Sequence, residues 1–158
     1  MNQEDIYNMR YGMYLGRQRG YTLLRAKLVT KAMLNLLDPQ AGDMILEIGC
    51  NNGYLLGEVT QLSPHSVGID INKDMIRRLN NNRIIYMNAR SLGFGNKAFD
   101  KVFSSHTLEH IPRIAEVLTE VHRVLKDQGI FVFSFPLELF RGQSAIKDST
   151  VLYGHPFY

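Results

Sequence analysis

The stretch that decides the fold is Ile45-Leu46-Glu47-Ile48-Gly49-Cys50-Asn51-Asn52-Gly53-Tyr54-Leu55. Its apolar start predicts a short buried strand, and the leucine and valine positions at 55, 56, 59 and 62 predict a helix after it. Gly49 and Gly53 mark a tight turn between the two. At such a turn, beside a helix N-terminus, the polar groups of a ligand can approach bare backbone closely.

Four further apolar runs follow Met44–Ile48, and helical patterns occupy most of the intervals between them. The runs are Ser66–Ile69, Ile84–Met87, Lys101–Ser104 and Gly129–Phe135. Alternating strands and helices imply right-handed crossovers and a mostly parallel sheet. We therefore expect an α/β fold, a three-layer sandwich. The interval 90–100 is too rich in glycine for a full helix.

Local signals predict the helix boundaries. Apolar residues at 24, 28, 32 and 36 recur every four positions, which predicts an inward stripe on a helix over 22–37. Asp38-Pro39 ends this helix because a residue before proline avoids helical backbone. Asn72 is expected to cap the helix whose apolar positions are 75, 76 and 79. Pro112 is expected to start the last helix, and residues 126–129 to lead from it into the fifth strand.

Composition and charge are those of an ordinary globular domain. The 158 residues suit one domain, with 45% apolar and 21% charged residues and a net charge of +3. The basic residues near the N-terminus are interpreted as a solvated helix face, with a patch for nucleic acid or an anionic substrate as the lesser alternative. Cys50 is the only cysteine, which excludes an internal disulfide and fits a reducing compartment. We expect a cytoplasmic protein with no membrane span and no signal peptide.

Two acidic residues near strand ends point to a nucleoside-bearing ligand. Glu47 precedes Gly49 by two positions, and G-x-x-x-G stands in place of the G-x-G-x-x-G of dinucleotide-binding folds. A carboxylate there suits a cationic or hydroxyl-bearing ligand better than a phosphate, although a plain tight turn would account for the pattern alone. Asp70 ends the second strand, where it can accept hydrogen bonds from both ribose hydroxyls. The alternative role of capping a helix falls better to Asn72.

Together these motifs resemble the class I S-adenosylmethionine (SAM) dependent methyltransferases, in the small-molecule branch whose fourth strand runs into a Leu-Glu-His-Ile segment. The resemblance covers residues 42–136. Its motifs, in order, are Glu47-x-Gly49-x-x-x-Gly53, Gly68-x-Asp70, Asn88-Ala89, Phe99-Asp100-x-Val102, Ser105–Ile111 and Glu120–Gly129. The resemblance implies a Rossmann-like sheet of seven strands that ends in an antiparallel hairpin. It also implies SAM as cofactor, S-adenosylhomocysteine as product, and no metal.

The resemblance assigns a cofactor site position by position. The glycine loop would hold the methionine portion, with its acidic residue beneath. The second strand end would bind ribose and flank adenine, the third would meet the adenine edge, and the fourth would line the methyl-transfer side. The expected cofactor-binding residues are Glu47, Gly49, Cys50, Asn51, Gly53, Asp70, Ile71, Asn88, Ala89 and Ser105.

Two of these positions depart from the family pattern. Asn51 stands where the family usually has glycine, and asparagine tolerates left-handed backbone better than other non-glycine residues. Asn88 stands where aspartate is usual, and its amide oxygen can still accept a hydrogen bond. Both departures are compatible with SAM binding.

Methyl transfer from a sulfonium needs alignment and the exclusion of water more than covalent help. A general base is needed only where the acceptor carries a proton of high pKa. His106 is the candidate base, with a structural role as an equal alternative, and His110 is interpreted instead as a helix-start residue bonded to backbone. Cys50 is rejected as a nucleophile because it lies inside the cofactor loop.

The expected function is methyl transfer from SAM to an unidentified small-molecule acceptor. The alternative is a SAM- or nucleoside-binding module without transfer activity; a dinucleotide-dependent oxidoreductase is disfavoured by the missing glycine fingerprint. The fourth strand lacks the Asn/Asp-Pro-Pro-aromatic motif of amino-group methyltransferases, and Phe135-Pro136 lacks the Pro-Cys nucleophile of cytosine enzymes. DNA is therefore not the expected substrate.

The chain is expected to divide into three parts. Residues 1–40 form a helical segment that caps the cofactor site, where Tyr7, Tyr11 and Tyr14 cover the cofactor or pack on the domain. Residues 41–136 form the SAM-binding core, and 137–158 an incomplete C-terminal tail. This tail is too short for a helix and two full strands, so C-terminal strands are expected to be missing. The fifth strand would then present an open edge, for which we expect either a homodimer through that edge or a disordered C-terminal tail.

Overall fold

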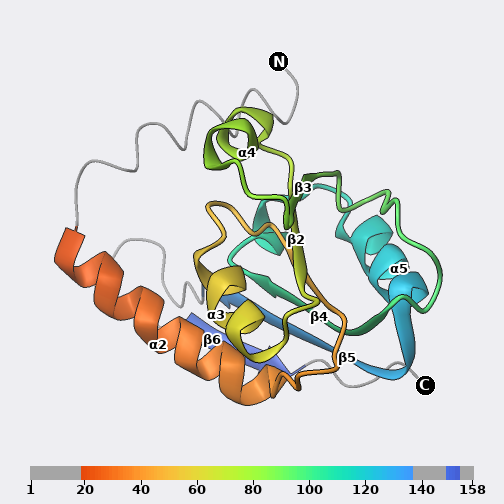
Figure 1. Ribbon diagram of the computed structural model, residues 1–158, viewed down its shortest axis with the longest axis horizontal. Coiled ribbons are helices and arrows are strands. Elements are labelled where there is room, and N and C mark those ends of the chain that lie inside the picture. The colour runs from red at the N-terminus through yellow and green to blue at the C-terminus, as the bar shows by residue number, and fades with distance from the viewer. Residues whose placement is uncertain (1–18, 137–148, 154–158) are drawn as a thin grey trace.

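The predicted apolar runs become the strands of one sheet. The computed structural model describes residues 19–136 and 149–153 (Figure 1). In chain order, the elements are α2 (Arg19–Leu37), β1 (Ile45–Ile48), α3 (Tyr54–Leu62), β2 (Val67–Asp70), α4 (Lys73–Leu79), β3 (Ile84–Tyr86), β4 (Phe99–Ser105), η1 (Leu108–His110), α5 (Ile114–Val124), β5 (Leu125–Pro136) and β6 (Ser149–Tyr153). The interval between β3 and β4 holds no helix, as its glycines predict.

The sheet has the order β3-β2-β1-β4-β5-β6, with β1 to β5 parallel. The strand order reverses at β1: β2 lies on one side of it and β4 on the other. Glu47 marks this centre, since it pairs with Gly68 of β2 and with Phe103 of β4. In open parallel sheets, ligands bind where the order reverses, beyond the carboxyl ends of the strands. The mostly parallel Rossmann-like sheet is confirmed.

Alternation along the strands divides the core between two layers of helices. Buried side chains on one face pack with α2 and α3, and those on the other face pack with α5, which lies on the opposite side of the sheet (Figure 1). The first group includes Ile45, Phe103 and Val132; the second includes Leu46, Val102 and Phe131. Successive strand residues thus point to opposite layers, as a pleated strand requires.

The inward face of α2 differs from the predicted stripe. Met33 and Leu37 are fully buried against β1, β4 and β5, whereas Leu28 is 61% exposed. The predicted row (24, 28, 32 and 36) and the buried row (33 and 37) both repeat every four residues, and they lie one residue apart around the helix. Packing against the sheet selects the row with Met33 and Leu37, so the predicted stripe was wrong by one position.

The other helices follow their local signals with small differences. The Asn72 side chain caps α4, accepting a hydrogen bond from the Met75 amide at 3.0 Å. However, α4 has no buried residue, and Ile76 packs only partly against the sheet. The helix α5 begins at Ile114, two residues after Pro112. Among the described residues, no helix combines the length and apolar character needed to cross a bilayer.

The edge of β5 is paired, contrary to the sequence prediction. Strand β6 runs antiparallel to β5, and the paired residues extend from Val132 with Tyr153 to Pro136 with Ser149. The prediction of an open β5 edge is therefore wrong, and a dimer through that edge loses its basis. The C-terminal segment is too short for a helix and two strands, but it is long enough for the single short strand β6. The N-terminal tyrosines at 7, 11 and 14 lie outside the described residues.

Phe103 offers a direct test of this core. It is fully buried in the central strand β4, so Phe103→Ala should lower the free energy of unfolding by about 3–5 kcal/mol. Urea unfolding followed by circular dichroism measures the loss. Leu28→Ala, at the exposed side of α2, is the control and should change stability by roughly 0.5 kcal/mol or less. Equal losses in the two variants would contradict the assigned faces.

Candidate functional site

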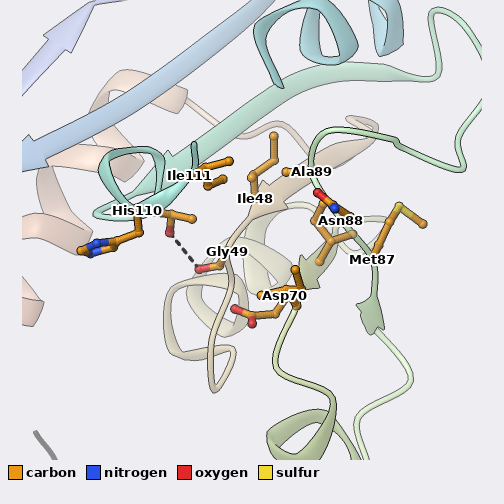
Figure 2. A pocket seen from close by; sticks show the side chains of 11 residues that line it. Ile48, Gly49, Asp70, Met87, Asn88, Ala89, His110 and Ile111 are labelled. Carbon is orange, nitrogen blue, oxygen red and sulfur yellow. Dashed lines mark hydrogen bonds between the residues drawn. The ribbon is translucent and has the colours of Figure 1, made fainter. Parts of the chain in front are cut away.

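A pocket lies where the strand order reverses, at the carboxyl ends of β1, β2 and β3, beneath the turn after β4. It holds about 520 Å³ of space, part of it open to solvent. The lining residues are Ile48, Gly49, Ile69, Asp70, Ile71, Met87, Asn88, Ala89, Thr107, His110 and Ile111 (Figure 2). Most are apolar, with a few polar groups among them.

The turn after β1 brings bare backbone to the pocket. Gly49 and Gly53 have φ of 76° and 75°, and Asn51 adopts the left-handed backbone expected of it, with φ of 47°. The amides of Gly49 and Cys50 donate to the Ile69 carbonyl at 2.9 and 3.0 Å, which fixes the turn to β2. A β-carbon at Gly49 would lie 2.2 Å from the Thr107 side chain, so only glycine fits there.

Asp70 ties two loops together. Its carboxylate accepts from the Asn51 amide and from the Asn72 amide, each at 2.8 Å. The residue is only 5% exposed, yet it lines the pocket. A carboxylate has about four acceptor positions, so two remain after these bonds. Asp70 thus holds the β1 turn beside the start of α4 and keeps acceptor capacity at the pocket.

Glu47 lies beneath the turn and does not line the pocket. Its side chain points toward the α3 layer, where the Leu56 amide donates a hydrogen bond to it. Within the described part of the chain, its Oε2 atom is buried without a hydrogen-bond partner. Burial raises the pKa of Glu47 to about 8, the nearby charge of Asp70 adds to the rise, and the Leu56 bond opposes it. Glu47 is therefore mainly protonated at neutral pH in this structure.

The third strand contributes the far wall of the pocket. The Met87 amide donates to the Asp70 carbonyl at 3.0 Å, which places residues 87–89 beside the β2 end. The Asn88 Oδ1 atom accepts from the Arg90 amide at 3.0 Å, so the expected acceptor already has one donor. Its second lone pair remains for a ligand.

A strained turn after β4 covers the other end of the pocket. His106 has φ of 51°, a left-handed conformation that is uncommon for residues other than glycine and often found at functional sites. The Thr107 hydroxyl donates to the Ser105 carbonyl at 3.1 Å and reaches the Gly49 carbonyl at 3.4 Å (Figure 2). Glu109 Oε1 lies 3.8 Å from both His106 Nδ1 and the His110 Nε2 atom. The turn therefore joins a two-histidine cluster to the β1 loop.

The structure brings five of the ten expected cofactor residues to the pocket wall: Gly49, Asp70, Ile71, Asn88 and Ala89. The other five, Glu47, Cys50, Asn51, Gly53 and Ser105, support the wall from behind or beside it, and the expected base His106 also lies off it. Ser105 instead bonds the Ser134 hydroxyl at 3.1 Å. Burial raises the pKa of the Cys50 thiol, which agrees with its rejection as a nucleophile.

Sequence reasoning missed several wall residues. Met87 immediately precedes the Asn88-Ala89 pair, and Thr107 and Ile111 lie in the segment after β4, so their positions at strand ends were the available signal. His110 lines the pocket although it was interpreted as a backbone-bonded residue; its amide does donate to the Thr107 carbonyl at 2.9 Å. In the described part of the chain, no three His, Cys, Asp or Glu side chains are arranged to hold a metal ion.

Comparison with known proteins gives a family match over the central part of the chain. Residues 46–133 match the family model described as "Methyltransferase domain". The putative methyltransferase YrhH of Bacillus subtilis is 31% identical over an alignment of 118 positions, which covers 68% of this chain and 66% of YrhH. The 24-methylenesterol C-methyltransferase 2 of Oryza sativa subsp. japonica is 32% identical over an alignment of 112 positions, which covers 62% of this chain and 30% of that protein.

A solved structure gives the same fold. The PH0226 protein from Pyrococcus horikoshii superposes with a TM-score of 0.64 and 26% identity, over 76% of this chain and 60% of that one. The chain thus spans between 30% and 66% of the length of these three proteins. The part that the family model matches, residues 46–133, runs from β1 into β5.

The buried acid predicts a pH-dependent stability. The pKa of Glu47 rises from 4.5 to about 8 on folding. The stability that depends on a protonated Glu47 is therefore fully present below pH 4.5 and is lost as the pH rises through about 8. Relative to Glu47→Gln, the wild-type free energy of unfolding should fall by roughly 1 kcal/mol per pH unit between these values and then level off. Urea titrations across that window measure it. Parallel pH profiles for the two proteins would contradict a proton held by Glu47.

Proposed function

Because this chain belongs to the methyltransferase domain family, we propose that it binds SAM and transfers its methyl group to a small-molecule acceptor. The observation that carries the proposal is the position of Asp70. An almost buried carboxylate with free acceptor capacity lies in the wall of an apolar pocket, where the strand order of the sheet reverses. A hydrogen-bond acceptor at this place suits the hydroxyl groups of a ribose, and the apolar walls beside it suit the face of a purine.

The residues present fit SAM along its length. At Gly49, the position that a β-carbon would fill is occupied by the Thr107 side chain, so only glycine allows the β1 turn to pack against the turn after β4 at the pocket. Glu47 lies beneath the β1 turn and off the pocket wall, and we assign it the role of orienting the loop that holds the methionine portion. We assign ribose to Asp70, and adenine to the space between Ile71 and the Asn88-Ala89 pair.

Bound SAM supplies a methyl group that its sulfonium already activates. The chain's own residues then need to orient the cofactor and exclude water. Where an acceptor carries a proton, we assign its removal to the His106–Glu109–His110 cluster. His106, the base expected from the sequence, lies behind the wall, while His110 lies at the end of the pocket opposite Met87 (Figure 2).

A small-molecule acceptor is supported by two observations. The rice relative is named for a sterol that it methylates, and a sterol is a small apolar molecule. The chain also lacks the motifs by which DNA methyltransferases engage their bases. We place the protein in the cytoplasm, where a reduced Cys50 is stable.

The second candidate is a SAM-binding module without transfer activity. It is favoured by the composition of the pocket wall, which includes the residues assigned to ribose and adenine but not the expected base His106. Methyl transfer from radiolabelled SAM to a panel of sterols, quinones and polyketides separates the two candidates. Labelled product supports the transferase, and tight binding with no product across the panel favours the module.

Titration calorimetry tests the proposed cofactor. The protein should bind SAM and S-adenosylhomocysteine and should show no binding of NAD, because the pyrophosphate fingerprint is missing. Binding of NAD in preference to both adenosyl ligands would point to dinucleotide chemistry. The absence of binding to either adenosyl ligand would overturn the proposal.

Asp70→Ala tests the ribose assignment. Loss of two hydrogen bonds to ribose should weaken SAM binding by roughly 1–3 kcal/mol. The variant also frees the Asn51 and Asn72 amides, so its melting temperature is measured beside the affinity. Asp74→Ala, in the exposed first turn of α4, is the matched control and should bind SAM as the wild type does. An unchanged affinity in Asp70→Ala would remove Asp70 from the site.

A further inference from the structure

One part of the sequence resemblance, the run Glu120–Gly129, has no role in the site described so far. Within it, Arg123 is the centre of a dense hydrogen-bond network at the end of α5. All five N–H groups of its guanidinium donate hydrogen bonds, at 2.8–3.0 Å. Nε and Nη2 bond the two carboxylate oxygens of Glu120, and Nη2 also bonds the Leu92 carbonyl. Nη1 bonds the Phe94 carbonyl and Asn96 Oδ1. The guanidinium is therefore completely used within the fold.

Two further bonds attach the same loop to α5. The Leu92 amide donates to Glu120 Oε2 at 2.6 Å, and the Lys97 amide donates to the Arg123 carbonyl at 2.9 Å. Glu120 and Arg123 thus fasten the loop 92–97 at both ends and in the middle. Charge-assisted bonds of this kind are among the stronger ones in proteins.

The fastened loop contacts the pocket wall directly. The Arg123 side chain bonds the carbonyls of Leu92 and Phe94, the two neighbours of Gly93. The Gly93 amide in turn donates to the Met87 sulfur at 3.3 Å. Met87 lines the pocket, so a chain of contacts leads from α5 to the far wall without any contact between Arg123 and the pocket itself.

Packing strengthens this connection. Leu92 and Ala89 are 6% and 7% exposed and belong to the same core cluster as the α5 residues Val117 and Val121. The Ser91 amide donates to the Asn88 carbonyl at 3.0 Å, which closes a tight turn over residues 88–91, directly before Leu92. Displacing Leu92 would therefore move Ala89 and Asn88, because the turn between them has little freedom.

We propose that Arg123, through Glu120 and the loop 92–97, is the positioning residue for the adenine end of the SAM pocket. The proposal rests on the proposed SAM function and adds to it a residue outside the pocket on which nucleoside affinity depends. Five donors in a rigid planar fork suit this task, whereas lysine offers three donors at a single atom. The ion pair with Arg123 also lowers the pKa of Glu120, so the network stays charged at neutral pH.

Arg123→Lys tests the proposal, since it keeps the charge and loses the fork. Titration calorimetry with S-adenosylhomocysteine and with adenosine should show both affinities weakened by the same factor, roughly tenfold, because the two ligands share the nucleoside. Hydrogen exchange should also become faster at the Leu92 and Gly93 amides and remain unchanged in β1 and β4. Both measurements are made well below the melting temperature, on protein that is folded by circular dichroism.

The control variant is Asp127→Ala, which removes another charge pair of the same loop. Asp127 bonds Lys97 Nζ at 2.7 Å, but both side chains are largely exposed, so affinity should stay at the wild-type value. If Arg123→Lys lowers only the melting temperature and leaves both affinities unchanged, the network is merely structural and the proposal is overturned. If the wild type binds neither ligand, the proposed SAM function itself is wrong, and the positioning role in it falls too.

Discussion

The pocket depends on the hydrogen bonds by which the Asp70 carboxylate connects two loops. The carboxylate accepts from the Asn51 amide on the β1 turn and from the Asn72 amide at the start of α4, each at 2.8 Å. Without it, two partly buried backbone donors would lose this partner. The register of β1 beside β2 brings these groups together, so the connection is a direct consequence of the parallel pairing at the centre of the sheet.

Energetically costly features lie close to Asp70. A buried acid with a raised pKa, Glu47, lies under the turn, and the left-handed residues Asn51 and His106 lie on the turns after β1 and β4. Backbone strain of this kind beside a pocket is typical of a functional site. The core thus supplies the stability, and the strand ends supply the chemistry.

Much of the fold follows from local patterns in the sequence, and the differences have identifiable causes. The strands could be predicted because buried parallel strands are short apolar runs. The face of α2 could not, because two rows with equal spacing compete and only contact with Phe103 and Val132 decides between them. Strand β6 was missed because its partner is set by tertiary pairing. In the site, Gly49 and Asp70 could be predicted from their chemistry, and both line the pocket. Met87 and Arg123 act through contacts across the fold, which no local pattern reveals.

The central claim is that this pocket is a SAM site with Asp70 at the ribose. A crystal structure of the protein with S-adenosylhomocysteine tests it most directly. We expect the ribose hydroxyls within hydrogen-bond distance of the Asp70 carboxylate, the adenine edge at Asn88, and the sulfur above Gly49, facing the turn that carries His106 and His110. The space beyond the sulfur would then outline the acceptor. Ordered ligand at another place, or in this pocket with no contact to Asp70, would contradict the account.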